Sequence, residues 1–214
     1  HKGSLYELNF VQGISPKELR ILSFMPYCSD EFAVPINKNK LSKIDKEIHI
    51  VGIGNFSNEF NSKRIIYGFL KSLFEQKIHA HFYIKISHIP KKDEEDYIKT
   101  LFGDLYKSRF LHIHEPLKPK EIIKEISQYD FGLWMSYGKE IPEVRFSMGN
   151  KLASYLEAGM PVLVDERAIF VNKLMKYYGL KVSFNKKNIK NLKKTLKKLD
   201  YKKLDSNVIK ARED

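Results

Sequence analysis

The segment 147–164 constrains the fold most, because it joins a helix to a strand across a glycine stop. Four apolar residues recur in it at helical spacing: Met148, Leu152, Tyr155 and Leu156. Ser147 is a suitable N-cap residue, and Gly159 followed by Pro161 is a strong stop signal, so we expect a helix over 147–158. The short apolar run 161–164 is typical of a strand in a parallel sheet that is covered on both faces. The segment therefore predicts one helix–strand unit of an α/β fold.

The same alternation of short apolar and longer amphipathic segments extends over most of the chain. We expect strands at 48–52, 80–86, 110–114, 131–136, 162–164 and 182–184. We expect helices at 62–76, 92–106, 118–128, 147–158, 168–178, 187–199 and 201–213. This order predicts an α/β fold with a Rossmann-like, doubly wound parallel sheet of about six strands, in which ligands bind beyond the carboxyl ends of the strands. Residues 5–47 do not fit the alternation, although 19–25 is a further candidate strand.

The composition limits the environment of the protein. Its 214 residues, 43% of them apolar, suffice for one domain with a proper core. The single cysteine, Cys28, excludes an intrachain disulfide and suits a reducing compartment. No run of 18 apolar residues and no signal peptide is visible. We therefore expect a cytoplasmic location, either free or at the inner face of the membrane.

The formal net charge is +12, and much of the excess lies near the C-terminus. The lysines there would form the outer face of the predicted helix 187–199: Lys186, Lys187, Lys190, Lys193, Lys194, Lys197 and Lys198. Three interpretations stay open, namely a solvated helix face, contact with an anionic membrane surface, and nucleic-acid binding. We expect no nucleic acid, because aromatic residues are not interleaved with these lysines as stacking platforms for bases would be.

A family resemblance is carried by the pair Asn150-Lys151, the tyrosine-containing helix after it, and the run Gly159-Met160-Pro161-Val162. These features resemble the signature of family-4-like GT-B glycosyltransferases, in their C-terminal nucleotide-sugar-binding domain. A whole GT-B enzyme has two Rossmann-like halves, so this chain looks like one of them. The segment 26–35 resembles the connector into that half, with Tyr27 and Cys28 in place of the usual Asn and Gly. The resemblance implies that residues 1–40 are the tail of an N-terminal domain plus the connector, and that residues 41–214 bind the donor.

Gly52 and Gly54 directly follow the first expected core strand, where a Rossmann-like sheet brings its backbone close to phosphate. They do not complete a dinucleotide fingerprint, because Ser57 stands at the third glycine position, so we expect neither NAD nor FAD. The resemblance implies that Lys63 or Arg64, after this loop, contacts the donor diphosphate. A tight turn followed by exposed basic residues is the alternative.

The first turn of the predicted helix 147–158 is the more specific candidate for a phosphate site. A helix N-terminus presents free N–H groups and the positive end of the helix dipole, and Asn150 and Lys151 lie there. Arg145, in the loop just before, would add a bidentate clamp. An ordinary polar first turn is the alternative. We expect these three residues to hold a diphosphate.

Retaining family-4 enzymes carry two glutamates eight positions apart, which by the resemblance fall here on Phe146 and Ser154. Neither acid is present. Glu157, one helical turn beyond Ser154, is the preferred substitute for contacts to ribose or sugar hydroxyls, and Glu143 is the other candidate. An exposed helix face is the alternative role for Glu157.

Further candidates lie at the end of the strand 110–114. The resemblance implies that His114 and Glu115 lie beside the nucleotide base. His112 and His114 alternate along the strand, and with no Cys or Asp at ligand spacing we expect no metal site. The acidic run 93–96 is interpreted as a capped helix start, not as a metal-binding cluster.

The resemblance thus implies a metal-independent glycosyltransferase domain of hexosyltransferase type, acting in polysaccharide or glycoconjugate biosynthesis. Its donor would be a UDP- or GDP-sugar, with no further cofactor, and its glycan or lipid-linked acceptor would be held by an absent N-terminal half. Basic groups and helix N–H groups would stabilise the departing nucleoside diphosphate, so this piece alone should bind donor without turnover. A non-catalytic nucleotide-sugar-binding domain is the first alternative, and a basic nucleic-acid-binding domain is the second.

Overall fold

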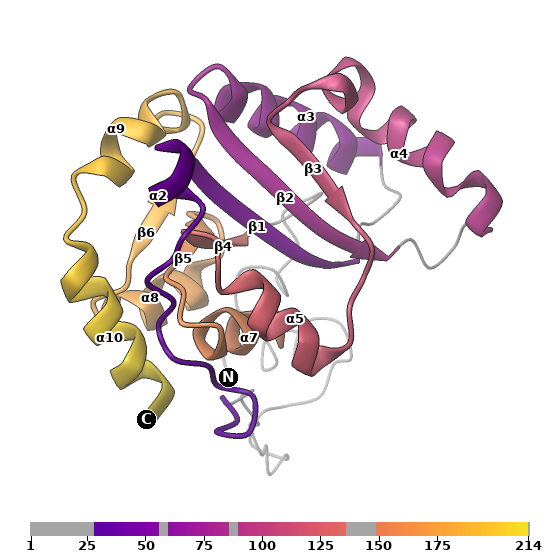
Figure 1. The fold of residues 1–214 in the computed structure, drawn as a ribbon. Coiled ribbons are helices and arrows are strands. Elements are labelled where there is room, and N and C mark those ends of the chain that lie inside the picture. The colour runs from indigo at the N-terminus through magenta and orange to yellow at the C-terminus, as the bar shows by residue number, and fades with distance from the viewer. Residues whose placement is uncertain (1–27, 56–59, 86–89, 136–148, 214) are drawn as a thin grey trace, which may run out of the picture.

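The computed structural model describes residues 28–55, 60–85, 90–135 and 149–213, and in these a single parallel sheet forms the centre of the molecule (Figure 1). Its strands are β1 (Ile48–Asn55), β2 (Ile78–Lys85), β3 (Leu111–His114), β4 (Phe131–Trp134), β5 (Val162–Asp165) and β6 (Val182–Phe184). They lie in the order β3-β2-β1-β4-β5-β6, and every neighbouring pair is parallel. The predicted doubly wound α/β sheet of six strands is confirmed.

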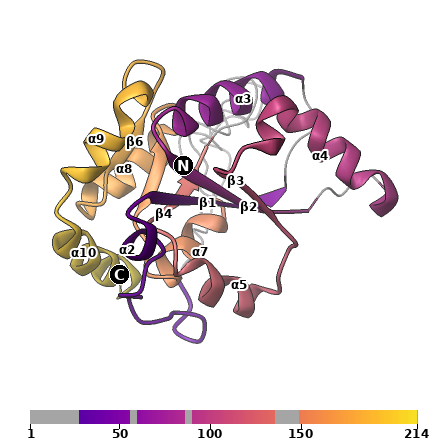
Figure 2. The same cartoon turned by 45° about the horizontal axis from the view of Figure 1, so that its top comes forward.

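Helices cover both faces of this sheet. The α-helices are α2 (Ser42–Asp45), α3 (Phe60–Phe74), α4 (Glu94–Phe102), α5 (Pro119–Ile126), α7 (Lys151–Glu157), α8 (Ile169–Tyr177), α9 (Leu192–Lys197) and α10 (Tyr201–Glu213), and short 3-10 turns occur at η3 (Lys91–Asp93), η4 (Gly103–Lys107) and η5 (Ile189–Asn191). Figure 2 shows α3 and α4 on one side of the sheet and α5 and α7 on the other. Within the described residues, no helix has both the length and the apolar character needed to cross a membrane.

Each face of the sheet buries its own apolar cluster. On one side α3, α4 and α9 pack against side chains of β1 and β2 such as Ile50 and Phe82. On the other side α5, α7, α8 and α10 pack against Val51, Val162 and Val164. Because parallel strands covered on both faces have no solvent side, β4 and β5 are buried at every position.

The glycine stop after α7 forms as the sequence predicts. Gly159 has a φ of 73°, its N–H donates to the carbonyl of Leu156, and the N–H of Met160 donates to the carbonyl of Tyr155. Glycine adopts this left-handed backbone conformation with the least strain, because it has no Cβ. Here a Cβ would also meet the backbone of Ile36 at 3.3 Å. The turn then leads directly into β5.

Two expected helices are broken in the structure. The segment 92–106 divides into η3, α4 and η4, and Gly103, with a φ of 58°, lies at the break. The segment 187–199 divides into η5 and α9. Asp93 precedes α4 as predicted, but its side chain makes no capping hydrogen bond. The expected N-cap Ser147 and the candidate strand 19–25 lie outside the described residues.

The connector segment, residues 28–41, runs along the outside of the domain beside α7 (Figure 1). The N–H of Val34 donates to the carbonyl of Glu157, and the N–H of Leu41 donates to that of Gln128. Residues 28–41 add no strand to the sheet. The connector thereby fixes the ends of α7 and α5 on the side of the sheet where their apolar faces pack.

Candidate functional site

The strand order reverses between β1 and β4. From β1 the chain proceeds to β2 and β3 on one side, and from β4 to β5 and β6 on the other. The two central strands pair only at Ile50 with Phe131 and at Val51 with Gly132, so their carboxyl ends are not hydrogen-bonded to each other. In open α/β sheets the crevice outside such a switch point is where ligands bind. We call the carboxyl ends of β1 and β4, with the start of α7, the switch-point site.

The gap between the two strands is bridged by a single side chain, that of Tyr155 in α7. Its hydroxyl accepts a hydrogen bond from the N–H of Ile53 at 3.1 Å and donates one to the carbonyl of Leu133 at 3.0 Å. The ring is fully buried and lies against Gly132, where any Cβ would overlap it. Burial raises the pKa of the Tyr155 hydroxyl, so the group stays neutral. The Tyr155 bridge therefore fixes α7 on the sheet at the switch-point site.

Lys151, the first residue of α7, lies at the site with its charge over an aromatic ring. Its Nζ is 4.9 Å from the centre of the Trp134 ring, at the end of β4. Burial lowers the pKa of Lys151 to about 8, because desolvation disfavours the charged form. A partly desolvated ammonium interacts more strongly with an anion than an exposed one does. Trp134 therefore positions the cation that the sequence analysis singled out.

The two glycines of β1 have different surroundings. Gly54 has a φ of 111°, and a Cβ there would have no atom of the described residues within 4 Å, so among these residues its backbone is open to a ligand. At Gly52 a Cβ would meet the Phe82 ring at 2.8 Å, on the face covered by α3. Gly52 is therefore explained by packing, while Gly54 keeps the exposed backbone that phosphate binding requires.

Asn150 and Ser154 lie on the same helix as Lys151. Asn150 is exposed, and its side chain makes no capping hydrogen bond to α7. Ser154 is half-buried one turn further on. At the start of α7 the N–H of Leu152 donates to the carbonyl of Gly149, and the N–H of Ser154 donates to that of Asn150. Fewer N–H groups are therefore left to face a ligand at the switch-point site than at the start of a helix with no preceding turn.

No contact among the described residues places the other predicted site residues at the switch-point site. Lys63 and Arg64 belong to the first part of α3, but the structure does not describe their side chains. Glu143 and Arg145 lie in the segment 136–148, also outside it. His114 and the exposed Glu115 stand at the end of β3, the edge strand, which β2 separates from β1. Their predicted roles stay predictions.

Glu157, the preferred substitute for the missing family acids, has an internal partner. It is the last residue of α7, beside the amino end of β5, and so lies at the opposite edge of the sheet from the switch-point site. Its carboxylate Oε1 accepts a hydrogen bond from the N–H of Ser29 at 2.7 Å. The side chain is buried, so the alternative of an exposed helix face is wrong, and the predicted contact of Glu157 with the sugar stays a prediction. The geometry gives Glu157 the role of anchoring the connector.

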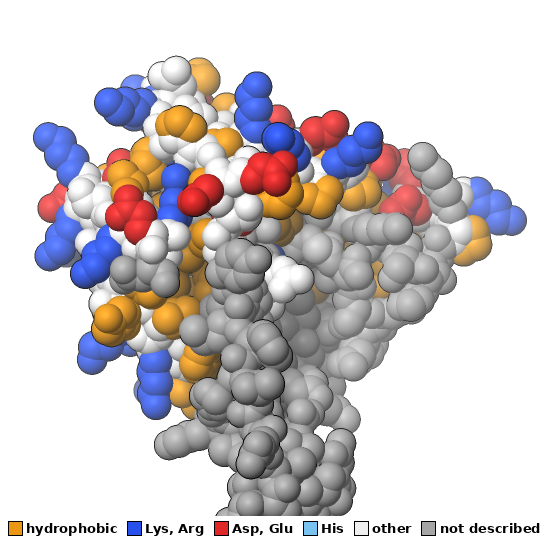
Figure 3. Space-filling model, turned by 90° about the horizontal axis from the view of Figure 1, so that it is seen from below, with side chains coloured by type: hydrophobic (Ala, Val, Ile, Leu, Met, Phe, Trp, Pro, Cys, Tyr) orange, Lys and Arg blue, Asp and Glu red, His pale blue; other side chains and the backbone are white. Residues whose placement is uncertain are grey.

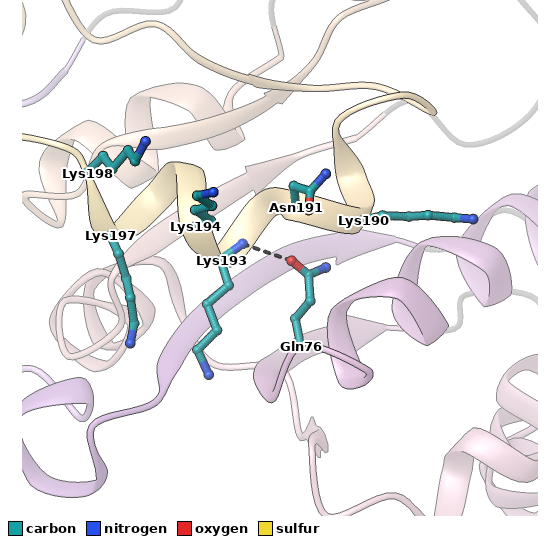
Figure 4. A pocket seen from close by; sticks show the side chains of 7 residues that line it. All are labelled: Gln76, Lys190, Asn191, Lys193, Lys194, Lys197 and Lys198. Carbon is teal, nitrogen blue, oxygen red and sulfur yellow. Dashed lines mark hydrogen bonds between the residues drawn. The ribbon is translucent and has the colours of Figure 1, made fainter.

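A hollow of about 550 Å³ lies elsewhere, where η5 and α9 meet the end of α3 (Figure 4). Its lining residues are Gln76, Lys190, Asn191, Lys193, Lys194, Lys197 and Lys198. The side-chain oxygen of Gln76 accepts a hydrogen bond from the N–H of Lys193 at 2.9 Å, which ties α9 to α3. Gln76 lies two residues before the start of β2, so the hollow belongs to the amino edge of the sheet and not to the switch-point site.

Sequence reasoning missed a cluster of histidines on β1, β2 and β3. The chain pairs His49 with His79 and His81 with His112 across neighbouring strands, on the face covered by α5. Asp45 and Glu47 accept hydrogen bonds from two of these rings. These carboxylates contact His49 and His79, which the sequence analysis did not consider, and not His112 or His114. The missed signal was the repeated His-x-His alternation, which places side chains of adjacent strands on one face.

No protein-family model matches the sequence, and no curated protein matches it significantly. The fold is similar to that of Anabaena HepE, solved with UDP-glucose (12% identity, 96% of this chain and 55% of that chain, TM-score 0.62). It is also similar to the pneumococcal O-GlcNAc transferase GtfA, solved with UDP and GlcNAc (10% identity, 99% and 40%, TM-score 0.61). A third similar structure is an O-GlcNAc transferase mutant of Thermobaculum terrenum (14% identity, 78% and 32%, TM-score 0.54).

The chain spans between 32% and 55% of the length of these three proteins. At such identities the likeness concerns the fold. It confirms that this chain has the GT-B type of Rossmann-like domain that the sequence resemblance implied.

Proposed function

We propose that this domain binds the nucleoside diphosphate part of an activated sugar at the switch-point site and is the donor-binding half of a glycosyltransferase. The observation that carries the proposal is the position of Lys151 over Trp134, at the carboxyl end of β4, the strand next to β1 with its exposed Gly54. A diphosphate is stabilised by fixed N–H donors and a cation in a water-poor site. Solved proteins of this fold were crystallised with UDP and UDP-glucose, which supports a nucleotide-sugar ligand.

In the proposed reaction, the bond between the anomeric carbon and the diphosphate breaks as an acceptor hydroxyl attacks. Lys151 and the N–H groups at the start of α7 stabilise the negative charge that develops on the leaving diphosphate. Arg145, which precedes α7 in the sequence and lies outside the described residues, is proposed as a second cation. The acceptor, a glycan or a lipid-linked glycan, and any base acting on it would belong to a separate N-terminal half. The proposed mechanism needs no metal at the switch-point site.

The proposal is tested by calorimetric titration with UDP and GDP. Lys151→Met keeps the apolar stem on Trp134 and removes only the charge, so it should weaken binding by about 1–3 kcal/mol, the range for a lost charge-assisted hydrogen bond. Lys173→Met, at an exposed position of α8, is the matched control and should bind as the parent does. Equal affinity of the parent and Lys151→Met would remove Lys151 from the site.

A non-catalytic nucleotide-sugar-binding domain is the second candidate function. It is favoured by Ser154, which stands where the family places an acid, and by the internal hydrogen bond of Glu157. Donor hydrolysis by a protein that contains both halves distinguishes the two candidates. Hydrolysis above the uncatalysed rate supports the transferase, while tight binding without hydrolysis supports the binding domain.

Contact of α9 with an anionic membrane surface is a further proposal for the lysine-rich face, at the cytoplasmic side of the membrane. Five lysines line the hollow in Figure 4, and such clusters are attracted to acidic headgroups. Nucleic-acid binding has less support, because on the face drawn in Figure 3 basic and acidic side chains are interspersed along the rim. Sedimentation with acidic vesicles, compared with neutral ones, tests the membrane contact.

A further inference from the structure

The five described histidines form a hydrogen-bonded ladder across three strands. We call His49, His79, His81, His112 and His114 the histidine ladder. One row runs from His49 Nδ1 to His81 Nε2 at 2.9 Å and from His81 Nδ1 to His114 Nε2 at 3.0 Å. The other row joins His79 Nδ1 to His112 Nε2 at 2.9 Å. The rows stack on each other, with ring centres 4.4 Å apart for His49 and His79 and 4.2 Å apart for His81 and His112.

Each row ends at a carboxylate at the amino edge of the sheet. Asp45 Oδ2 is 2.9 Å from His49 Nε2 and 3.9 Å from His79 Nε2. Glu47 Oε2 is 2.6 Å from His79 Nε2. The ligand atoms of Asp45, Glu47 and His79 all lie within 4.8 Å of one another. Both carboxylates reach solvent, with side-chain exposures of 39% and 17%, whereas the two rings are buried.

We propose that Asp45, Glu47 and His79 bind a divalent transition-metal ion of the Zn²⁺ class, with water in the remaining position. Donors about 2.0–2.2 Å from a tetrahedral ion lie about 3.3 Å apart, and the two distances from His79 Nε2 to the carboxylates, 2.6 and 3.9 Å, fall on either side of that value. Two carboxylates and one imidazole match the ligand preferences of Zn²⁺. Small side-chain rotations at the open edge equalise these distances.

The ladder supplies the hydrogen bonds that a metal-bound histidine needs. While His79 Nε2 donates to Glu47, His79 Nδ1 accepts from His112. When a metal takes the lone pair of His79 Nε2, the proton on that nitrogen leaves to solvent. The proton of His112 Nε2 then passes along the hydrogen bond to His79 Nδ1, and His112 takes up one proton from solvent at its Nδ1, so the number of protons on the two rings does not change. Such a partner behind the metal ligand fixes the ring and raises its basicity.

His49 acts as a positioning residue in this site. Its Nε2 holds the same oxygen of Asp45 that faces His79, at 2.9 Å. Asp130 in turn accepts the backbone N–H of His49 at 2.8 Å, which ties the start of β1 to β4. The carboxylate of Asp45 is therefore oriented before an ion arrives.

Cations near the site work against metal binding. Arg109 Nη2 lies 3.1 Å from Glu47 Oε1 and 3.4 Å from Oε2, the oxygen that faces His79, and the side chain is 65% exposed. The charge of Lys193 also interacts with Glu47. An arriving ion has to displace the hydrogen bond from Arg109 to Oε2, so Arg109 lowers the affinity. Arg109→Gln should therefore tighten the binding of Zn²⁺ severalfold.

The test is a titration of the full chain with Zn²⁺ in competition with a chromogenic chelator, followed by circular dichroism to confirm folding. The parent should bind one ion per chain, and His79→Gln and Glu47→Gln should each lose at least tenfold in affinity. Asp96→Asn, whose parent side chain is 87% exposed on α4, is the matched carboxylate control and should leave the affinity unchanged. Absence of binding by the parent, or equal affinity in all variants, overturns the proposal.

A second measurement needs no variant. In ¹⁵N spectra of the histidine rings, Zn²⁺ should shift His79 Nε2 and move the proton of His112 from Nε2 to Nδ1. Shifts confined to His1 and His88, outside the described residues, would mean adventitious binding and would also overturn the proposal. The site lies at the amino edge of the sheet, so its failure leaves the proposed nucleotide site at the carboxyl edge unaffected.

Discussion

At the residue scale, the Tyr155 bridge depends on the absence of a side chain at Gly132. The ring occupies the space that a Cβ at residue 132 would need, and backbone and ring are both buried. Gly132→Ala should therefore lower the free energy of unfolding by about 1–3 kcal/mol, the usual cost of overpacking.

Gly68→Ala is the matched control, because residue 68 lies on the exposed face of α3 and a Cβ there meets no atom of the described residues within 4 Å. It should stabilise the protein by about 0.5–1 kcal/mol. Denaturant unfolding measures the free energy of unfolding of both variants and of the parent.

The charge of Lys151 gives the proposed nucleotide site a pH dependence. Because its pKa is lowered to about 8, the free protein loses the ammonium as the pH rises through that value. A diphosphate favours the charged form and raises the pKa in the complex, so affinity for UDP should be constant near pH 7 and fall by up to about tenfold per pH unit above 8. Lys151→Arg keeps its charge over this range and should show no such fall. Calorimetry from pH 6.5 to 9.5 makes the comparison. If the affinity of both proteins for UDP fell equally with rising pH, the effect would belong to a group other than Lys151.

The sequence predicted the roles of residues that depend on their neighbours in the sequence, and it missed the roles that depend on distant parts of the chain. Gly159 was predicted as the helix stop because the stop depends on its own φ and its immediate neighbours. The partner of Glu157 was not predicted, because the N–H of Ser29 is 128 positions away in the sequence. Lys151 was predicted at a helix start, but its lowered pKa depends on burial beside Trp134, which only the folded sheet provides.

At the element scale, the six strands and most of the helices were predicted because apolar alternation is a property of each segment. Boundaries were less exact. β1 continues to residue 55 instead of 52, and β2 begins at residue 78 instead of 80, since the two strands pair along their whole length. The strand order, and with it the switch-point site, could not be read from single segments. The histidine ladder is also a property of three strands in register, so His79 alone gave no signal.

The connector and α7 form a unit whose stability depends on Glu157. The carboxylate is the only acceptor shown for the N–H of Ser29, so Glu157→Ala should leave a half-buried donor without its partner and cost about 1–3 kcal/mol. Glu157→Gln keeps an acceptor oxygen and should cost less. Both variants should bind UDP within twofold of the parent, because the end of α7 lies opposite the switch-point site. Thermal unfolding and calorimetry measure the two effects. Weaker binding by a fully folded Glu157→Gln would restore this residue as a donor ligand.

At the scale of the whole molecule, the sheet separates two chemically different edges. Its carboxyl edge presents the open backbone of Gly54 and the cation Lys151, which suit an anion. Its amino edge presents Asp45, Glu47 and His79, which suit a cation. His79 pairs with His49, and the register of β1 with β4 places Trp134 level with Ile53, so four to five residues, or about 13–17 Å at about 3.3 Å per residue, separate the two sites along the strands. This distance is about twice the Debye length of about 8 Å in physiological salt.

The two proposed sites should therefore bind independently. Titration of the protein with UDP should give the same affinity within twofold whether or not the amino edge is saturated with Zn²⁺, since screened charges at that distance contribute little and no described contact joins Lys151 to His79. By reciprocity the affinity for Zn²⁺ should not change with UDP. Calorimetry in both orders, with free Zn²⁺ kept low so that it does not bind UDP in solution, measures the coupling. Tighter UDP binding in the presence of Zn²⁺ that persists in His79→Gln would place the metal at the diphosphate, and it would contradict a reaction that needs no metal at the switch-point site.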